Sequence, residues 1–142
     1  MSGVVAIRYL LANNAGVLAV VPAARIMAGD LPLSTTMPAI SIKQISSVPR
    51  LTVAMGEPRL LHTDRVQVSV LLKGPLGSPT GLGYPGQKAL LKLVLAACPN
   101  QRGTINGVAV DSILTDMEGP DLYDDPTSLF LGSRDFIVKY TV

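Results

Sequence analysis

Six acidic residues gather in the last third of the chain, and closely spaced carboxylates are the first candidates for chemistry. They are Asp111, Asp116, Glu118, Asp121, Asp124 and Asp125. A calcium-binding loop needs oxygen ligands at fixed alternating positions and a glycine at its sharp turn, and this spacing does not match. Three interpretations stay open: a solvated acidic face, a divalent cation held between subunits, or contacts with Lys and Arg of a neighbouring subunit.

The single histidine and the single cysteine are the other reactive side chains. His62 lies next to Thr63 and Asp64, but a general base needs an oriented nucleophile, and the sequence marks none. Cys98 falls on the apolar side of a predicted helix, just before Pro99, where we expect a buried structural thiol. We therefore predict that the protein is not an enzyme and has no catalytic residue, no metal site and no cofactor.

A glycine-rich stretch before a predicted helix could cradle a phosphate. Residues 73–86 contain five glycines and three prolines. Such a cradle needs successive backbone amides at the helix start, and the prolines remove amides. No Gly-Lys-Ser/Thr sequence follows, so a phosphate loop is not indicated. We expect a loop that orders on contact with a partner.

Composition indicates one domain, residues 1–142, with more apolar surface than a small monomer needs. Apolar residues make up 48% of the chain and the mean hydropathy is +0.40, although aromatic residues are scarce. We expect part of this aliphatic surplus to serve contacts between subunits.

Pro22 interrupts the longest weakly polar run, residues 15–24, so the sequence predicts no membrane span and no signal peptide. A single cysteine fits a reducing cytoplasm.

The net charge of +2 conceals two oppositely charged segments of unequal length. Residues 1–110 carry ten Lys or Arg and three Asp or Glu, a net of +7, whereas residues 111–142 carry two and seven, a net of −5. The basic residues are dispersed, so sequence-specific nucleic-acid binding is not predicted. In a head-to-tail ring each subunit presents two different faces, and unlike charges on those faces favour assembly.

Periodicity predicts two main helices and about four strands. Helices are expected over residues 2–14 and 87–98, and strands over residues 39–46, 65–72 and 129–142, with a hairpin turning at Asn106-Gly107. Residues 48–63 are predicted to be a long connection and residues 116–128 an acidic loop. The predicted fold is α+β: a mainly antiparallel sheet of about four strands with two main helices packed on one face.

Taken in order, these segments resemble the tail completion or tail terminator family of long-tailed, siphovirus-like bacteriophages. The resemblance extends over residues 4–142, and the order and spacing of the segments carry it rather than any one motif. The matching segments are residues 24–26, 31–32, 37–46, 65–70, 110–113, 121–125 and 134–140. This chain departs from the family in its long glycine- and proline-rich stretch after Lys73.

The resemblance implies a structural virion protein that forms a ring, expected to be a hexamer, at the end of the tail tube. Such a ring ends tube polymerisation and provides the surface on which the head connector docks. The implied partners are further copies of the chain, the major tail tube protein and the head–tail connector or neck proteins. DNA can pass through the ring lumen, and no membrane is involved. The resemblance further implies that the protein is made in the host cytoplasm and resides in the virion at the head–tail interface.

The predicted contact residues come from the two long connections and the acidic segment. We expect subunit or partner contacts at Arg50, Arg59, Lys73, Leu76, Leu82, Tyr84, Asp116, Glu118, Asp121, Tyr123, Asp124 and Asp125. Two other functions stay open. One is another neck or connector protein of the same particle, and the other is a small monomeric ligand-binding or metal-dependent protein.

Overall fold

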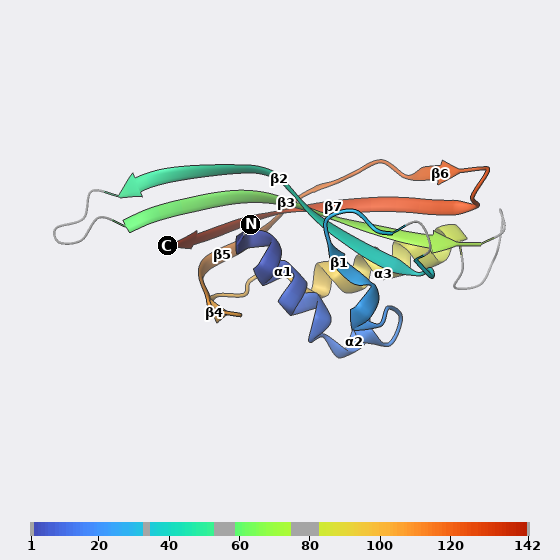
Figure 1. Cartoon of the computed structure of the whole chain (residues 1–142), viewed down its shortest axis with the longest axis horizontal. Coiled ribbons are helices and arrows are strands. Elements are labelled where there is room, and N and C mark those ends of the chain that lie inside the picture. Colours follow the sequence, from blue (N-terminus) through green and yellow to red (C-terminus); the bar gives the residue numbers. More distant parts are fainter. Residues whose placement is uncertain (1, 33–34, 53–58, 75–82, 142) are drawn as a thin grey trace.

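The computed structural model describes the chain except residues 1, 33–34, 53–58, 75–82 and 142 (Figure 1). Its elements are α1 (Ser2–Ala12), α2 (Ala15–Leu18), a 3-10 turn (Ala23–Arg25), β1 (Ile26–Ala28), β2 (Ala39–Thr52), β3 (Arg59–Lys73), α3 (Gly83–Ala97), β4 (Gly103–Ile105), β5 (Val108–Glu118), β6 (Leu122–Asp124) and β7 (Leu129–Thr141). In this part of the chain no helix is long and apolar enough to cross a membrane.

The strands of the described residues form one mixed sheet that curls into a half-barrel. The strand order is β1-β2-β3-β7-β5-β4, and β6 pairs with β7 beside β5. β1 runs parallel to β2, and every other pair is antiparallel. The predicted sheet of about four antiparallel strands with two packed helices is therefore wrong. Three of the seven strands have only three residues, too few to show the two-residue alternation on which strand prediction rests.

The helices cover one face of the sheet, and the core lies between them (Figure 1). α1 buries Val4, Ile7 and Leu11, and α3 buries Leu90 and Val94. Both sets repeat at helical spacing, which places each on one side of its helix. α3 begins at Gly83 rather than at residue 87, because a glycine at φ 66° opens the helix and Pro85 is tolerated in the first turn.

The two central strands alternate as their sequences predict. Val66, Val68 and Val70 of β3 are buried, and so are Phe136 and Val138 of β7. The register pairs Val66 with Phe136 across the strands, so both rows face the helices. The start of the last strand at Leu129 is confirmed, although residue 142 lies outside the described residues.

Two segments predicted to be loops contain strand residues. Residues 48–52 and 59–63 continue β2 and β3 as a long hairpin, with Val48 paired to Thr63. Residues 116–118 extend β5, and residues 122–124 form β6. Pro49 misled the first prediction, because proline is compatible with a strand that has a free edge. The prediction for residues 116–128 was wrong at the end of β5, because a bulge shifts the register between Thr115 and Glu118. The bulge breaks the alternation of apolar and polar residues that predicts a strand.

Candidate subunit-contact surfaces

Asp121 is at the centre of a polar cluster where α3 meets the β5–β6 connection. The ammonium of Lys88 lies 2.6 Å from Asp121 Oδ1 and 3.5 Å from Glu118 Oε1. The Tyr84 hydroxyl donates to Asp121 Oδ2 at 2.9 Å, and Arg134 approaches Glu118 at 3.7 Å. Predicted contact residues Tyr84, Glu118 and Asp121 are thus brought together within one subunit.

The electrostatics of this cluster follow from its hydrogen bonds. The bonds from Lys88 and Tyr84 hold the pKa of Asp121 below its ordinary value. The same carboxylate raises the pKa of Tyr84 and of Lys88, because each would lose a hydrogen bond to a negative group on deprotonation. The cluster is solvent-accessible, so it fastens the connection to α3 rather than forming a buried reactive centre.

A second ion cluster lies on the face of the sheet away from the helices. The Arg65 guanidinium is 2.5 Å from Asp116 and 3.1 Å from Asp135. It joins β3, β5 and β7, whose pairing places the three side chains side by side. Asp116, a predicted subunit or partner contact, therefore has an ion-pair partner in its own chain.

The rest of the acidic segment turns back on itself near β6. The Asp124 carboxylate accepts a hydrogen bond from Thr127, and the Tyr123 ring packs against Phe130 at 4.6 Å between centroids. Asp125 is exposed in the turn that follows. The residues that the structure describes contain no group of three or more side chains placed to hold a metal ion.

The outer part of the β2–β3 hairpin, residues 48–52 and 59–63, projects beyond the rest of the molecule, and we call it the arm (Figure 1). Leu51 is 68% exposed, and Val48 is also exposed. Arg50 lies exposed between them, and Arg59 starts the second strand opposite Thr52. An apolar surface of this kind on a protruding hairpin is typical of a contact site.

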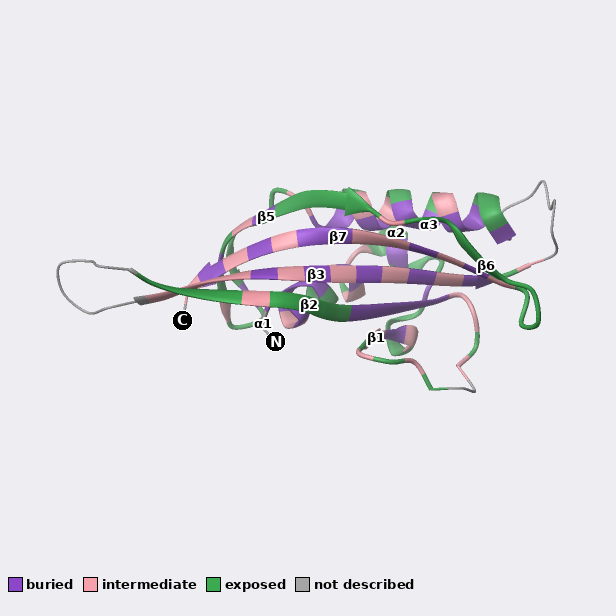
Figure 2. Cartoon of the chain, turned by 90° about the horizontal axis from the view of Figure 1, so that it is seen from above, coloured by how far each residue is buried: buried purple, intermediate pink, exposed green. Residues whose placement is uncertain are grey.

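Lys73, another predicted contact residue, lies near the opposite end of the sheet from the arm. Lys73 ends β3 and is exposed. Leu76 and Leu82 lie outside the described residues. Sequence reasoning also missed a second apolar surface: Leu114 and Met117 of β5 and Leu122 of β6 are exposed, and Met117 is 58% exposed. The burial colouring shows exposed residues along β5 and in the connection to β6 (Figure 2).

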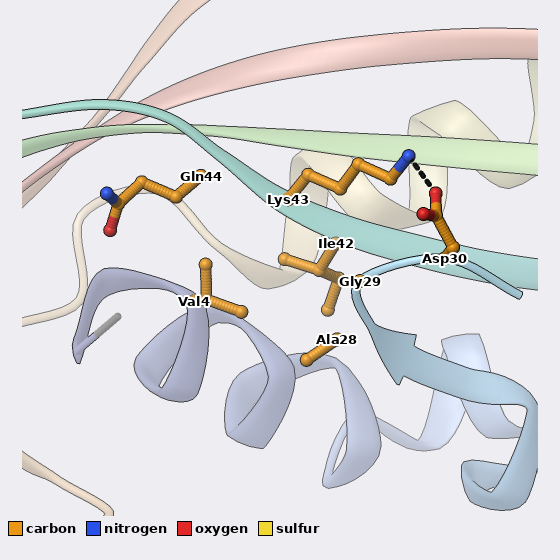
Figure 3. A pocket seen from close by; sticks show the side chains of 7 residues that line it. All are labelled: Val4, Ala28, Gly29, Asp30, Ile42, Lys43 and Gln44. Atoms are coloured by element: carbon orange, nitrogen blue, oxygen red, sulfur yellow. Dashed lines mark ion pairs between the residues drawn. The ribbon is translucent and has the colours of Figure 1, made fainter.

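A groove of about 400 Å³ opens between α1, β1 and β2 (Figure 3). An ion pair between Lys43 and Asp30 borders it, and its lining is mainly apolar. The lining residues are Val4, Ala28, Gly29, Asp30, Ile42, Lys43 and Gln44. The groove exists because β1 has only three residues. The chain leaves the sheet after Ala28, while β2 continues.

The structure places the single histidine in a strand and the single cysteine in the core. His62 lies within β3, and its ring stacks on Tyr140 with 5.0 Å between centroids. Cys98 is fully buried after the end of α3, and burial raises the pKa of its thiol to about 12. The expectation of a buried structural thiol at Cys98 is confirmed.

The fold is shared with a virion component, although the sequence alone identifies no relative. The chain matches no protein-family model and no curated protein sequence. A chain from the virion of a native gene transfer agent particle has a similar structure, with a TM-score of 0.64 and 10% sequence identity. The match covers 99% of this chain and 97% of that chain. The likeness therefore extends over the whole fold.

Proposed function

We propose that this protein is a structural component of a phage-like virion, and that it forms a ring that terminates the tail tube. The observation that carries the proposal is the end-to-end structural match to a gene transfer agent virion chain. The order of the sequence segments supplies the finer assignment to the tail end. On this proposal the partners are further copies of the chain, the tail tube protein and the head connector, and the protein resides in the particle.

The surface of the subunit supports an assembly role rather than catalysis. Exposed apolar side chains occur on the arm and on β5 and β6, at two separate parts of the sheet. A ring subunit needs two unlike contact surfaces, one for each neighbour. Because the acidic clusters at Asp116 and Asp121 are ion-paired within the chain, we propose a structural role without cofactor or metal.

Native mass spectrometry over a range of protein concentrations, with negative-stain imaging of any large species, tests the ring. Six copies of the 14.9 kDa chain would weigh about 89 kDa and show closed symmetry. Addition of purified tail tubes should place the ring at one tube end and stop further growth. Absence of the protein from purified particles would contradict the proposal.

Another neck or connector protein is the nearest alternative, and labelling the chain's position on the particle distinguishes the two. A monomeric ligand-binding protein is the second alternative, because the volume of the groove beside β2 falls within the range of small-molecule sites. That function requires a protein that stays monomeric at every concentration.

A further inference from the structure

The sheet has two exposed edges, one on β2 and one on β5. β1 pairs with β2 only at residues 40–42. In the described part of the chain, no strand lies beside residues 45–51 on the side away from β3. On the far side of the sheet, β4 pairs with β5 only at residues 108–110. Among the described residues no strand flanks residues 114–118 on the side away from β7. Open edges of this kind are templates for pairing with another chain.

The two edges lie at the same level of the sheet. Ser46 pairs with Arg65 of β3, Arg65 pairs with Ile137 of β7, and Ile137 pairs with Leu114 of β5. One cross-strand row therefore runs from Ser46 on one edge to Leu114 on the other. Two copies placed side by side with parallel strand axes would bring these exposed segments together.

The strand directions also suit such a contact. Three antiparallel steps separate β2 from β5, namely β2–β3, β3–β7 and β7–β5. β2 and β5 therefore run in opposite directions within one subunit. When copies related by rotation about an axis near the strand direction stand side by side, β5 of one copy meets β2 of the next as an antiparallel pair.

Side chains along the two edges are complementary. Ile45 at the β2 bulge and Val48 on the arm are exposed on one edge, and Leu114 and Met117 are exposed on the other. Arg50 lies on the β2 side, whereas Asp111 lies on β5. Burial of the apolar side chains favours association of two copies. Pairing of two identical edges is disfavoured, because it would bring like charges together.

The groove beside β2 can accommodate one of these side chains from a neighbouring copy. Asp135 pairs with Gln67 of β3, and Gln67 pairs with Lys43. The β5 bulge that contains Met117 lies opposite Asp135, so Met117 stands at the level of Lys43, which borders the groove. A methionine is flexible enough to fill an irregular apolar groove of this kind.

Pro49 limits the length of the pairing. It has no N–H, so the ladder on the β2 edge loses a donor there. The bulge between Gln44 and Ser46 bends the same edge. A short pairing segment of this kind fits a contact that must form in one register.

We propose that β2 of one copy pairs antiparallel with β5 of the next, with Met117 seated in the neighbour's groove, so that the sheet continues from subunit to subunit. The inference rests on the proposed ring but is more specific, because it names the two surfaces that meet. A second copy is the occupant, since both edges and their opposite charges belong to one chain.

Disulfide trapping tests the contact directly. In Ser46→Cys/Leu114→Cys the two thiols are three strand spacings apart within a subunit, roughly 14 Å, which exceeds the reach of a disulfide. Oxidation should therefore link different copies and give a ladder of species on a non-reducing gel. Val48→Cys/Leu114→Cys tests a neighbouring register, and Leu18→Cys/Leu114→Cys, with Leu18 exposed on α2, is the control. Cross-linking equal to the control in both pairs would overturn the inference.

Met117→Lys tests the groove, with Val20→Lys on another exposed apolar position as its control. We expect Met117→Lys to raise the concentration needed for assembly at least about tenfold, while Val20→Lys leaves it unchanged.

Closed rings without cross-links would contradict the edge pairing and leave the ring proposal standing. Cross-linked open filaments would support the edge pairing and contradict the closed ring. Monomers at every concentration, with no excess cross-linking, would contradict the edge pairing, while presence in particles separately tests the proposed function.

Discussion

The backbone N–H of Gly3 donates to Asp64 Oδ2 at 3.1 Å, which joins the first turn of α1 to β3. The Ser47 hydroxyl donates to the other carboxylate oxygen at 2.5 Å. Asp64 is fully buried, and a carboxylate near a helix N-terminus also interacts favourably with the helix dipole. One carboxylate thus fixes the position of α1 relative to β2 and β3.

Asp64→Ala should lower the free energy of unfolding by about 1–3 kcal/mol, because the buried Gly3 N–H and Ser47 hydroxyl lose an acceptor. Urea denaturation followed by circular dichroism measures the change. Asp125→Ala, at an exposed turn position, is the control and should leave the midpoint within error. Equal midpoints for the two variants would show that Asp64 does not anchor α1.

Val68→Asp should destabilise the fold by more than about 3 kcal/mol, since it places an unpaired charge in the core between sheet and helices. Ser69→Asp is the matched control, because this neighbouring side chain points to the opposite face and pairs with Ser41 and Ser133. Thermal unfolding of both variants measures the difference. An unchanged melting temperature for Val68→Asp would contradict the assigned facing of β3.

Cys98 should resist alkylation in the folded protein. Burial raises the pKa of its thiol to about 12, so the reactive thiolate is scarce at pH 8 and the sulfur is also shielded. Labelling with a maleimide followed by intact mass measurement should show no adduct in buffer and one adduct in denaturant. Rapid labelling of the native protein would show that the end of α3 opens in solution.

The sequence predicts the central elements because their alternation is regular. Val66, Val68 and Val70 alternate with polar residues, and the turn at Asn106-Gly107 adopts positive φ at both positions, as the dipeptide indicates. The arm was missed because Pro49 suggested a loop. The sequence carries little signal for it: residues 50–52 are Arg-Leu-Thr and residues 59–61 are Arg-Leu-Leu.

The candidate surfaces were harder to predict, because they depend on which strands end early. The groove exists only because β1 stops at Ala28, and no local pattern encodes the end of a three-residue strand. The sequence singled out the acidic residues, but it did not identify their partners. Arg65 is 51 residues from Asp116 along the chain, so only the sheet register brings these two charges together.

The Lys88–Asp121 pair should contribute a small pH-dependent stability. The pKa of Asp121 lies below its ordinary value of 3.8, so its contribution is present above that value and is lost as the pH falls through the lower folded-state pKa. Asp121→Asn should therefore lower the unfolding free energy at pH 7 by less than about 1 kcal/mol, because the pair is solvent-accessible. The difference from the parent should vanish near pH 2 and shrink in high salt. A difference that persists at pH 2 would contradict this origin.

Leu51→Ser should separate assembly from folding. Leu51 is 68% exposed near the end of the arm, so its replacement removes little buried surface from the monomer and should change the unfolding free energy by less than about 0.5 kcal/mol. If the arm packs against a neighbouring copy, the same change removes apolar contact from the interface and weakens association. Sedimentation velocity should show a shift toward monomer for Leu51→Ser and none for Leu18→Ser, an exposed apolar position on α2. Unaltered assembly by both variants would show that the arm contacts something other than another copy of the chain.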